Sequence, residues 1–147
     1  MTAAYVLATI LLVFAAATCV FGLVKGGAAE RFGAAVILAN LLAGMLNGWL
    51  IQQPLLSLVV NGLTALLLLP LTVYYASFWL GGVMLLYGLL FTLHAYYTVV
   101  GRPQDDLFAN LNNLNFFAVS LCLLSGTILA WRRRRRAAAR VRTQLSQ

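Results

Sequence analysis

Most of the side chains that can form a binding site in this chain are uncharged amides lying within long apolar runs. The set, completed by a tyrosine and the single histidine, is Asn40, Asn47, Asn61, Tyr87, His94, Asn112, Asn113 and Asn115. Asn40 and Asn47 are seven residues apart, as are Tyr87 and His94, so each pair shares one face of a helix. Such groups hold a ligand by hydrogen bonds. We expect them to suit a small molecule, a lipid head group or a quinone-like ring, with His94 as a hydrogen-bond partner.

Other site chemistries find little support in the sequence. There is no P-loop, GxSxG, HExxH or dinucleotide fingerprint, so no catalytic residue is assigned and an enzyme is not expected. His94 has no second histidine beside it, which argues against a metal or a haem cofactor. Cys19 and Cys122 lie in apolar runs without a CxxC pattern, and we expect two buried thiols rather than a disulfide.

The composition places these residues in a membrane. The chain has 147 residues, of which 63% are hydrophobic and 9% are charged, with a mean hydropathy of +0.92. A globular domain carries about 25% charged residues to form its polar surface. A soluble enzyme, a secreted disulfide scaffold and a disordered chain are therefore excluded.

Five apolar runs approach the length of about 20 residues that a membrane-spanning helix needs. They cover approximately residues 3–24, 32–50, 54–73, 78–99 and 111–131. We therefore predict an all-α, polytopic transmembrane helix bundle of five spans that forms a single domain over residues 1–131, followed by a basic tail over 132–147. A four-span alternative would join the second and third runs.

Two prolines and the acidic and basic residues give further detail on these spans. Pro54 suits a first helical turn, whereas Pro70 predicts a kink or an early end to the third helix. No Asp, Glu, Lys or Arg lies within any of the five runs, which argues against a proton-coupled antiporter. The first run lacks the basic n-region of a signal peptide, so we expect it to be retained.

The distribution of Lys and Arg predicts the orientation. The loop at 25–31, the link at 74–77 and the tail together carry nine of the ten Lys and Arg residues, and Arg102 is the tenth. Short loops rich in Lys and Arg stay in the cytoplasm. We therefore expect the N-terminus outside, the tail in the cytoplasm, and a multi-pass protein of a bacterial cytoplasmic (inner) membrane.

This orientation brings most of the polar residues to a common depth. Asn61 and His94 then lie about 10 and 8 Å below the outer ends of their helices, close to the level of Asn47 and of the group Asn112–Asn115. Unpaired amides are costly in hydrocarbon, so these groups should face one another in a polar cluster that opens outward, with Asn40 and Tyr87 extending it deeper. Alternatively, the amides only join the helices by hydrogen bonds.

Glycines and aromatic residues predict how the helices pack. Gly44 and Gly48 form a GxxxG pattern, for which we expect close helix packing inside the chain before homodimerisation. Trp79 and Trp131 lie at predicted membrane boundaries, where tryptophan anchors a helix.

The basic tail predicts a contact with lipid rather than with nucleic acid. Its consecutive arginines should bind anionic lipid head groups, with an acidic partner as the alternative; they are Arg132, Arg133, Arg134, Arg135 and Arg136. The basic charge belongs to this tail alone, so no nucleic acid is expected as a partner. A homo-oligomer or another membrane protein remains open as a partner.

Two short motifs carry a resemblance to a known group. Gly26-Gly27-Ala28-Ala29-Glu30-Arg31 opens one helix, and Phe78-Trp79 opens another that carries His94. Over residues 25–99 this pattern resembles a group of small, uncharacterised, polytopic inner-membrane proteins of alphaproteobacteria. The resemblance implies a bacterial inner-membrane location and no mechanism, since no activity is known to us for the group.

These observations predict an integral membrane protein that acts as an accessory or structural subunit, or that binds a small molecule or lipid through the outer-half polar cluster. One alternative is a small oligomeric carrier or channel. The other is a cofactor-dependent membrane enzyme or redox accessory, in which a cofactor or partner supplies the chemistry.

Overall fold

The computed structural model describes residues 2–145, and within this range all of its regular structure is helical. The helices are α1 (Thr2–Lys25), α2 (Ala28–Leu46), the short π-helix η1 (Asn47–Ile51), α3 (Pro54–Tyr75), α4 (Phe78–Val100) and α5 (Asp106–Leu145). Five helical segments, with η1 continuing α2, are long and apolar enough to cross a membrane. The all-α, five-helix prediction is confirmed, and the second and third runs do not merge into one span.

The structure corrects several predicted boundaries. Helix α2 begins at Ala28 and α5 at Asp106, each earlier than predicted, because polar residues occupy their first turns. Glu30 therefore lies in the first turn of the second membrane-length helix, just before the predicted apolar run at 32–50. Helix α3 begins at Pro54 as predicted but runs past Pro70 to Tyr75, so the helix does not end early.

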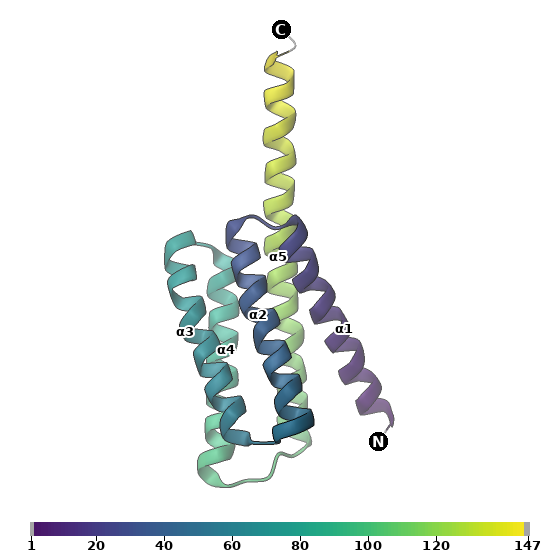
Figure 1. Cartoon of the computed structure of the whole chain (residues 1–147), viewed down its shortest axis with the longest axis vertical. Helices are drawn as coiled ribbons and strands as arrows, with labels where there is room; N and C mark the ends of the chain where they lie inside the picture. The colour runs from purple at the N-terminus through teal and green to yellow at the C-terminus, as the bar shows by residue number, and fades with distance from the viewer. Residues whose placement is uncertain (1, 146–147) are drawn as a thin grey trace.

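The helices run alternately up and down, which gives the bundle two distinct ends (Figure 1). At one end, called here the tail end, α5 continues beyond the bundle as a single rod that carries the arginines. The opposite end, called the loop end, holds the turn at 52–53 and the loop at 101–105. Helix α3 packs on α4, α5 packs on α1 and α4, and α2 lies between α1 and α3.

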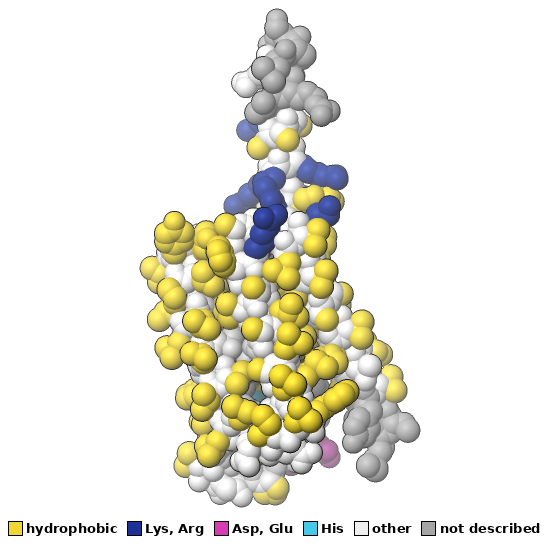
Figure 2. Space-filling view, viewed as in Figure 1, with side chains coloured by type: hydrophobic (Ala, Val, Ile, Leu, Met, Phe, Trp, Pro, Cys, Tyr) yellow, Lys and Arg dark blue, Asp and Glu magenta, His cyan; other side chains and the backbone are white. Residues whose placement is uncertain are grey.

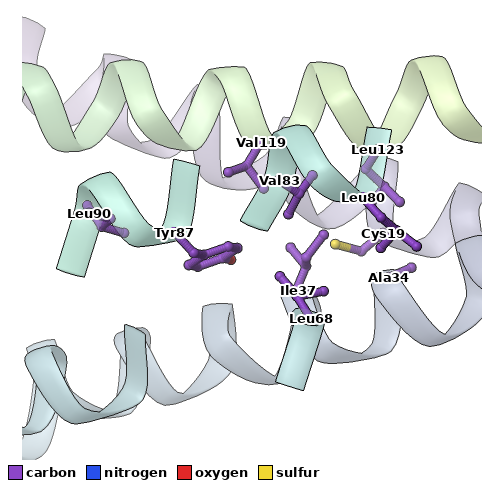
Figure 3. Close-up of a cluster of buried hydrophobic side chains, with 10 residues drawn as sticks. All are labelled: Cys19, Ala34, Ile37, Leu68, Leu80, Val83, Tyr87, Leu90, Val119 and Leu123. Carbon is purple, nitrogen blue, oxygen red and sulfur yellow. The ribbon is translucent and has the colours of Figure 1, made fainter. Parts of the chain in front are cut away.

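Both the surface and the core of the bundle are largely apolar. Apolar side chains cover the visible face of the bundle, and the basic side chains gather where α5 leaves it (Figure 2). The core draws on all five membrane-length helices (Figure 3) and comprises Cys19, Ala34, Ile37, Leu68, Leu80, Val83, Tyr87, Leu90, Val119 and Leu123. Cys19 is buried and Cys122 is half-buried, both as free thiols.

Trp79 closes the tail end of the bundle. Its indole nitrogen donates a hydrogen bond to Glu30 Oε1 over 3.1 Å. The other carboxylate oxygen of Glu30 accepts the backbone N–H of Gly27 over 2.8 Å. A Cβ atom at Gly33 of α2 or Gly126 of α5 would lie 2.6 and 2.5 Å from the indole, so only glycine admits the ring. Trp79 thus packs between helices, and its interpretation as a simple boundary anchor was incomplete.

Candidate functional site

At the loop end, Asn47 organises the turn between α2 and α3. Helix α2 ends in the π-helix η1, and the left-handed residue Gln52 reverses the chain. Asn47 Nδ2 donates to the Gln53 carbonyl and to Ser57 Oγ over 3.0 and 2.7 Å. Asn47 Oδ1 accepts the Gln53 backbone N–H over 3.1 Å. Asn47 therefore connects the end of one helix to the start of the next and uses both amide protons and its carbonyl oxygen for this purpose.

Asn40 lies at the centre of a buried polar layer about two turns deeper. Its Nδ2 donates to Asn61 Oδ1 over 3.1 Å and to Thr64 Oγ1 over 2.9 Å. The Tyr87 hydroxyl donates to Asn40 Oδ1 over 3.3 Å. All four side chains are buried. This layer connects α2, α3 and α4. At this depth the amides join helices by hydrogen bonds, which is the alternative that the sequence left open for the cluster.

His94 is held with a defined tautomer. Its Nδ1 donates to the Leu90 carbonyl over 2.9 Å, because a carbonyl oxygen can only accept. In the neutral ring, Nε2 is then an acceptor. The Phe108 ring packs against the imidazole in an edge-to-face arrangement, with the ring centres 4.9 Å apart. His94 thus offers its surroundings a fixed hydrogen-bond acceptor.

A cavity of about 340 Å³ lies between these groups. Asn47, Asn61, His94 and Asn112 line it, each from a different membrane-length helix. Asn40 and Ser57 also contribute to the wall. These residues belong to the polar cluster that the sequence predicts, and the structure places them around one cavity.

The cavity exists because the neighbouring face of α2 is made of small residues. Apart from the adjacent residues and backbone of the same helix, no atom of the described chain lies within 4 Å of the position that a Cβ would take at Gly44 or Gly48. Both glycines line the cavity. The predicted close packing of a helix against this GxxxG pattern was therefore wrong, since at these positions glycine leaves room instead of admitting a neighbour.

The inner cavity opens toward the loop end. A larger space of about 690 Å³ shares Asn47, Ser57, His94 and Gln104 with it. The wall of this outer part is formed by the turn at 52–54 and the loop at 101–104. The two spaces form one funnel that narrows from the loop end to the Asn40 layer.

Asp105 fixes the loop at the mouth of the funnel. Its Oδ1 accepts hydrogen bonds from the Tyr97 hydroxyl over 2.7 Å and from the Phe108 backbone N–H over 3.0 Å. Arg102 forms an ion pair with Oδ2 over 2.9 Å. These contacts, the Tyr97 bond foremost, hold the pKa of Asp105 below its ordinary value. Asp105 also caps the start of α5 and so ties the loop to two helices.

The funnel offers hydrogen bonds without charge at its inner end. Among the residues that the structure describes, no Asp, Glu, Lys or Arg lines the inner cavity. Asn61 Nδ2, the Asn112 amide and His94 Nε2 form no hydrogen bonds with residues that the structure describes. The inner cavity therefore presents amide donors and an imidazole acceptor to whatever enters it.

Two predicted members of the cluster lie elsewhere. Asn113 is half-buried and lines neither part of the funnel. Asn115 faces a separate groove between α4 and α5. Helical geometry accounts for the difference: at 3.6 residues per turn, Asn113 lies about 100° around α5 from Asn112, and Asn115 lies about 60° away in the opposite direction, toward α4.

Several site residues were not found by sequence reasoning. Ser57 and Thr64 are seven residues apart and lie on the same face of α3 as Asn61. The seven-residue spacing that grouped Asn40 with Asn47 would therefore have found them. Gln104 and Asp105 lie in a loop, whose conformation no periodic pattern encodes.

The arginines surround α5 at the tail end rather than forming one face. Five consecutive residues cover more than a full helical turn, and all five side chains are exposed. Arg134 donates to the carbonyl of Lys25 at the end of α1. The Arg135 guanidinium lies 4.2 Å from the Trp131 ring centre. The five arginines at 132–136, called here the arginine collar, thus contact the end of α1 and the Trp131 ring and present positive charge on all sides of α5.

No protein-family model, curated protein or solved structure gives a significant match to this chain. What the site can bind must therefore follow from its own geometry and chemistry.

Proposed function

We propose that the funnel binds a small uncharged molecule, or the uncharged part of one, such as a quinone-like ring or a lipid head group. The observation that carries this proposal is the inner cavity lined by Asn61, His94 and Asn112. Its amides and imidazole have hydrogen-bonding capacity that the described chain does not use. Polar groups that face such a space are normally satisfied by water or a ligand, so an occupant with a carbonyl and a hydroxyl group suits them.

The absence of charge at the inner end supports an uncharged ligand. A charged group entering a space with no opposite charge would lose its hydration without compensation. Phe108 and Phe116 also line the inner cavity and offer flat apolar surfaces to a ring. Arg102 lies only at the mouth, where a charged substituent would stay near water.

The shape of the funnel supports binding rather than conduction. The inner cavity reaches the Asn40 layer, and the side chains of Leu68, Leu80 and Val83, nearer the tail end, are fully buried. A space that ends inside the bundle serves a binding protein or an accessory subunit better than a pore.

Ligand binding can be tested by filling the cavity. Gly48→Leu places a side chain in the space, whereas Gly88→Leu changes another glycine with no atom within 4 Å of its Cβ position and outside the funnel. We expect a short-chain benzoquinone to raise the melting temperature of the wild type and Gly88→Leu, but not of Gly48→Leu. Equal shifts in all three proteins, or no saturable shift in the wild type, would overturn the proposal.

We further propose that the loop end faces outward and the tail end faces the cytoplasm of a bacterium. The proposal rests on the concentration of Lys and Arg at the tail end. In a variant in which Cys19 and Cys122 are replaced by alanine, a cysteine at position 104 should react with a membrane-impermeant maleimide in intact cells. A cysteine at position 138 should react only after lysis, and the reverse pattern would contradict this orientation.

The arginine collar is proposed to contact anionic lipid head groups on the cytoplasmic side. Each basic residue near an anionic surface contributes about 1 kcal/mol, less when crowded or screened. The distribution of the arginines around the whole helix supports a lipid surface, which meets the helix from every side.

A further inference from the structure

The groove between α4 and α5 contains a polar group without a partner. Asn115 Nδ2 is buried and forms no hydrogen bond within residues 2–145. The other walls of the groove are almost entirely apolar and come from Leu86, Leu89, Leu90, Thr92, Leu93, Tyr96, Leu111, Leu114 and Ala118. Thr92 donates its hydroxyl to the Gly88 carbonyl and accepts no hydrogen bond from the Asn115 amide. A buried amide donor left unpaired in such surroundings destabilises the fold unless an acceptor reaches it.

This groove is distinct from the funnel and lies on the lateral surface of the bundle. Leu89 and Leu114 on its walls are 65% and 63% exposed, which places the groove on the surface that a membrane would cover. Leu90, at 3% exposure, belongs to both linings and separates the two spaces. Asn115 therefore cannot be satisfied by a ligand in the funnel.

We propose that this groove binds an acyl chain whose carbonyl oxygen accepts a hydrogen bond from Asn115 Nδ2. The apolar walls suit a hydrocarbon chain, and the orphan donor requires one acceptor. The groove runs from Leu86 to Tyr96, about 15 Å along α4, and has a volume of about 620 Å³. A helix is about 10–12 Å across with its side chains, so a groove of this size seats a single chain better than another helix.

The depth of Asn115 fits a carbonyl at the start of such a chain. Asn115 lies one turn, about 6 Å, below Leu111 on the loop-end side of the groove. Tyr96 lies on the same side, where tyrosine marks the level of lipid head groups. An acyl carbonyl located just inside that level would meet the amide, while its chain continues along the leucines toward the tail end.

A comparison of ester and ether lipids isolates the proposed hydrogen bond. Diester and diether phosphatidylglycerol share head group and chains, but only the diester has the carbonyl oxygens. In native mass spectrometry of the purified, delipidated protein, we expect the wild type to bind the diester about three- to tenfold more tightly than the diether, the value of one hydrogen bond. Competition by palmitate separates two sources of the carbonyl: displacement of bound diester indicates that a free fatty acid is accepted, and no displacement assigns the groove to ester-linked lipid.

Three variants complete the test. Asn115→Leu should bind both lipids equally, and Asn113→Leu, at a neighbouring amide outside the groove, should keep the preference for the diester. Ala118→Phe fills the groove but retains the amide, and should weaken both lipids, which keeps the proposal testable if Asn115→Leu does not fold. An undiminished diester preference in Asn115→Leu would overturn the proposal. So would a wild-type dimer that Asn115→Leu dissociates without any change in lipid binding, since the groove would then be a protein interface.

Discussion

The two halves of this bundle use glycine in opposite ways. At the tail end, Gly33 and Gly126 bring α2 and α5 against the Trp79 ring, and no larger residue fits there. Toward the loop end, Gly44 and Gly48 face open space and line the funnel. The same residue type closes one half and hollows the other. The difference shows that the tail half is closely packed, whereas the other half contains the space to which we assign ligand binding.

The largest expected contrast comes from adding one methyl group in each half. Gly126→Ala would force Cβ against the indole of Trp79, so we expect a loss of about 1–3 kcal/mol from overpacking. Gly44→Ala meets no atom and should be neutral or stabilising by up to about 1 kcal/mol, because alanine favours a helix. Unfolding in detergent measures both. In a Trp79→Leu background the cost of Gly126→Ala should largely disappear. A cost that persists would show that the Trp79 ring is not what excludes a side chain at position 126.

A somewhat smaller effect is expected from losing the hydrogen bond between the Trp79 indole and Glu30. Trp79→Phe keeps an aromatic ring but leaves Glu30 Oε1 without its donor, for which we expect a loss of about 1–2 kcal/mol. Trp131→Phe is the matched control, because the contact of that ring is with the exposed Arg135. Its unfolding free energy should change by less than about 0.5 kcal/mol. Equal losses in the two variants would contradict a specific role for the Glu30 contact.

The comparison can be sharpened within the open half, where some polar groups join helices and others line empty space. Asn40→Leu removes the partner of Tyr87, Asn61 and Thr64 at once, and should cost about 1–2 kcal/mol. Asn112→Leu removes an amide without a described partner and should leave the unfolding free energy nearly unchanged while weakening the binding of a quinone probe. A stability loss at Asn112 as large as that at Asn40 would remove the distinction between structural and ligand-directed amides.

The sequence predicted the features that periodicity and hydropathy control. The five helices, the start of α3 at Pro54 and the convergence of Asn40, Asn47, Asn61, Tyr87 and His94 all follow from apolar length and seven-residue spacing. What GxxxG does was not predictable, because whether a neighbour approaches a glycine depends on the bulk of residues elsewhere, such as Trp79 against Gly33. The Glu30–Trp79 bond joins residues 49 apart in sequence and depends on which helices become neighbours.

The smallest effect concerns the mouth of the funnel and depends on pH. Because the pKa of Asp105 is lower in the folded protein than in the unfolded chain, its carboxylate stabilises the loop fully above the unfolded value of about 3.9. That stabilisation is lost as the pH falls through the folded pKa. The backbone amide of Phe108, which donates to Asp105, should report the transition in an NMR titration. Tyr97→Phe removes the main cause of the shift and should move the midpoint to higher pH. Tyr96→Phe, which removes no hydrogen bond to Asp105, should leave it in place, and identical midpoints in all three proteins would show that the Tyr97 bond does not hold the loop.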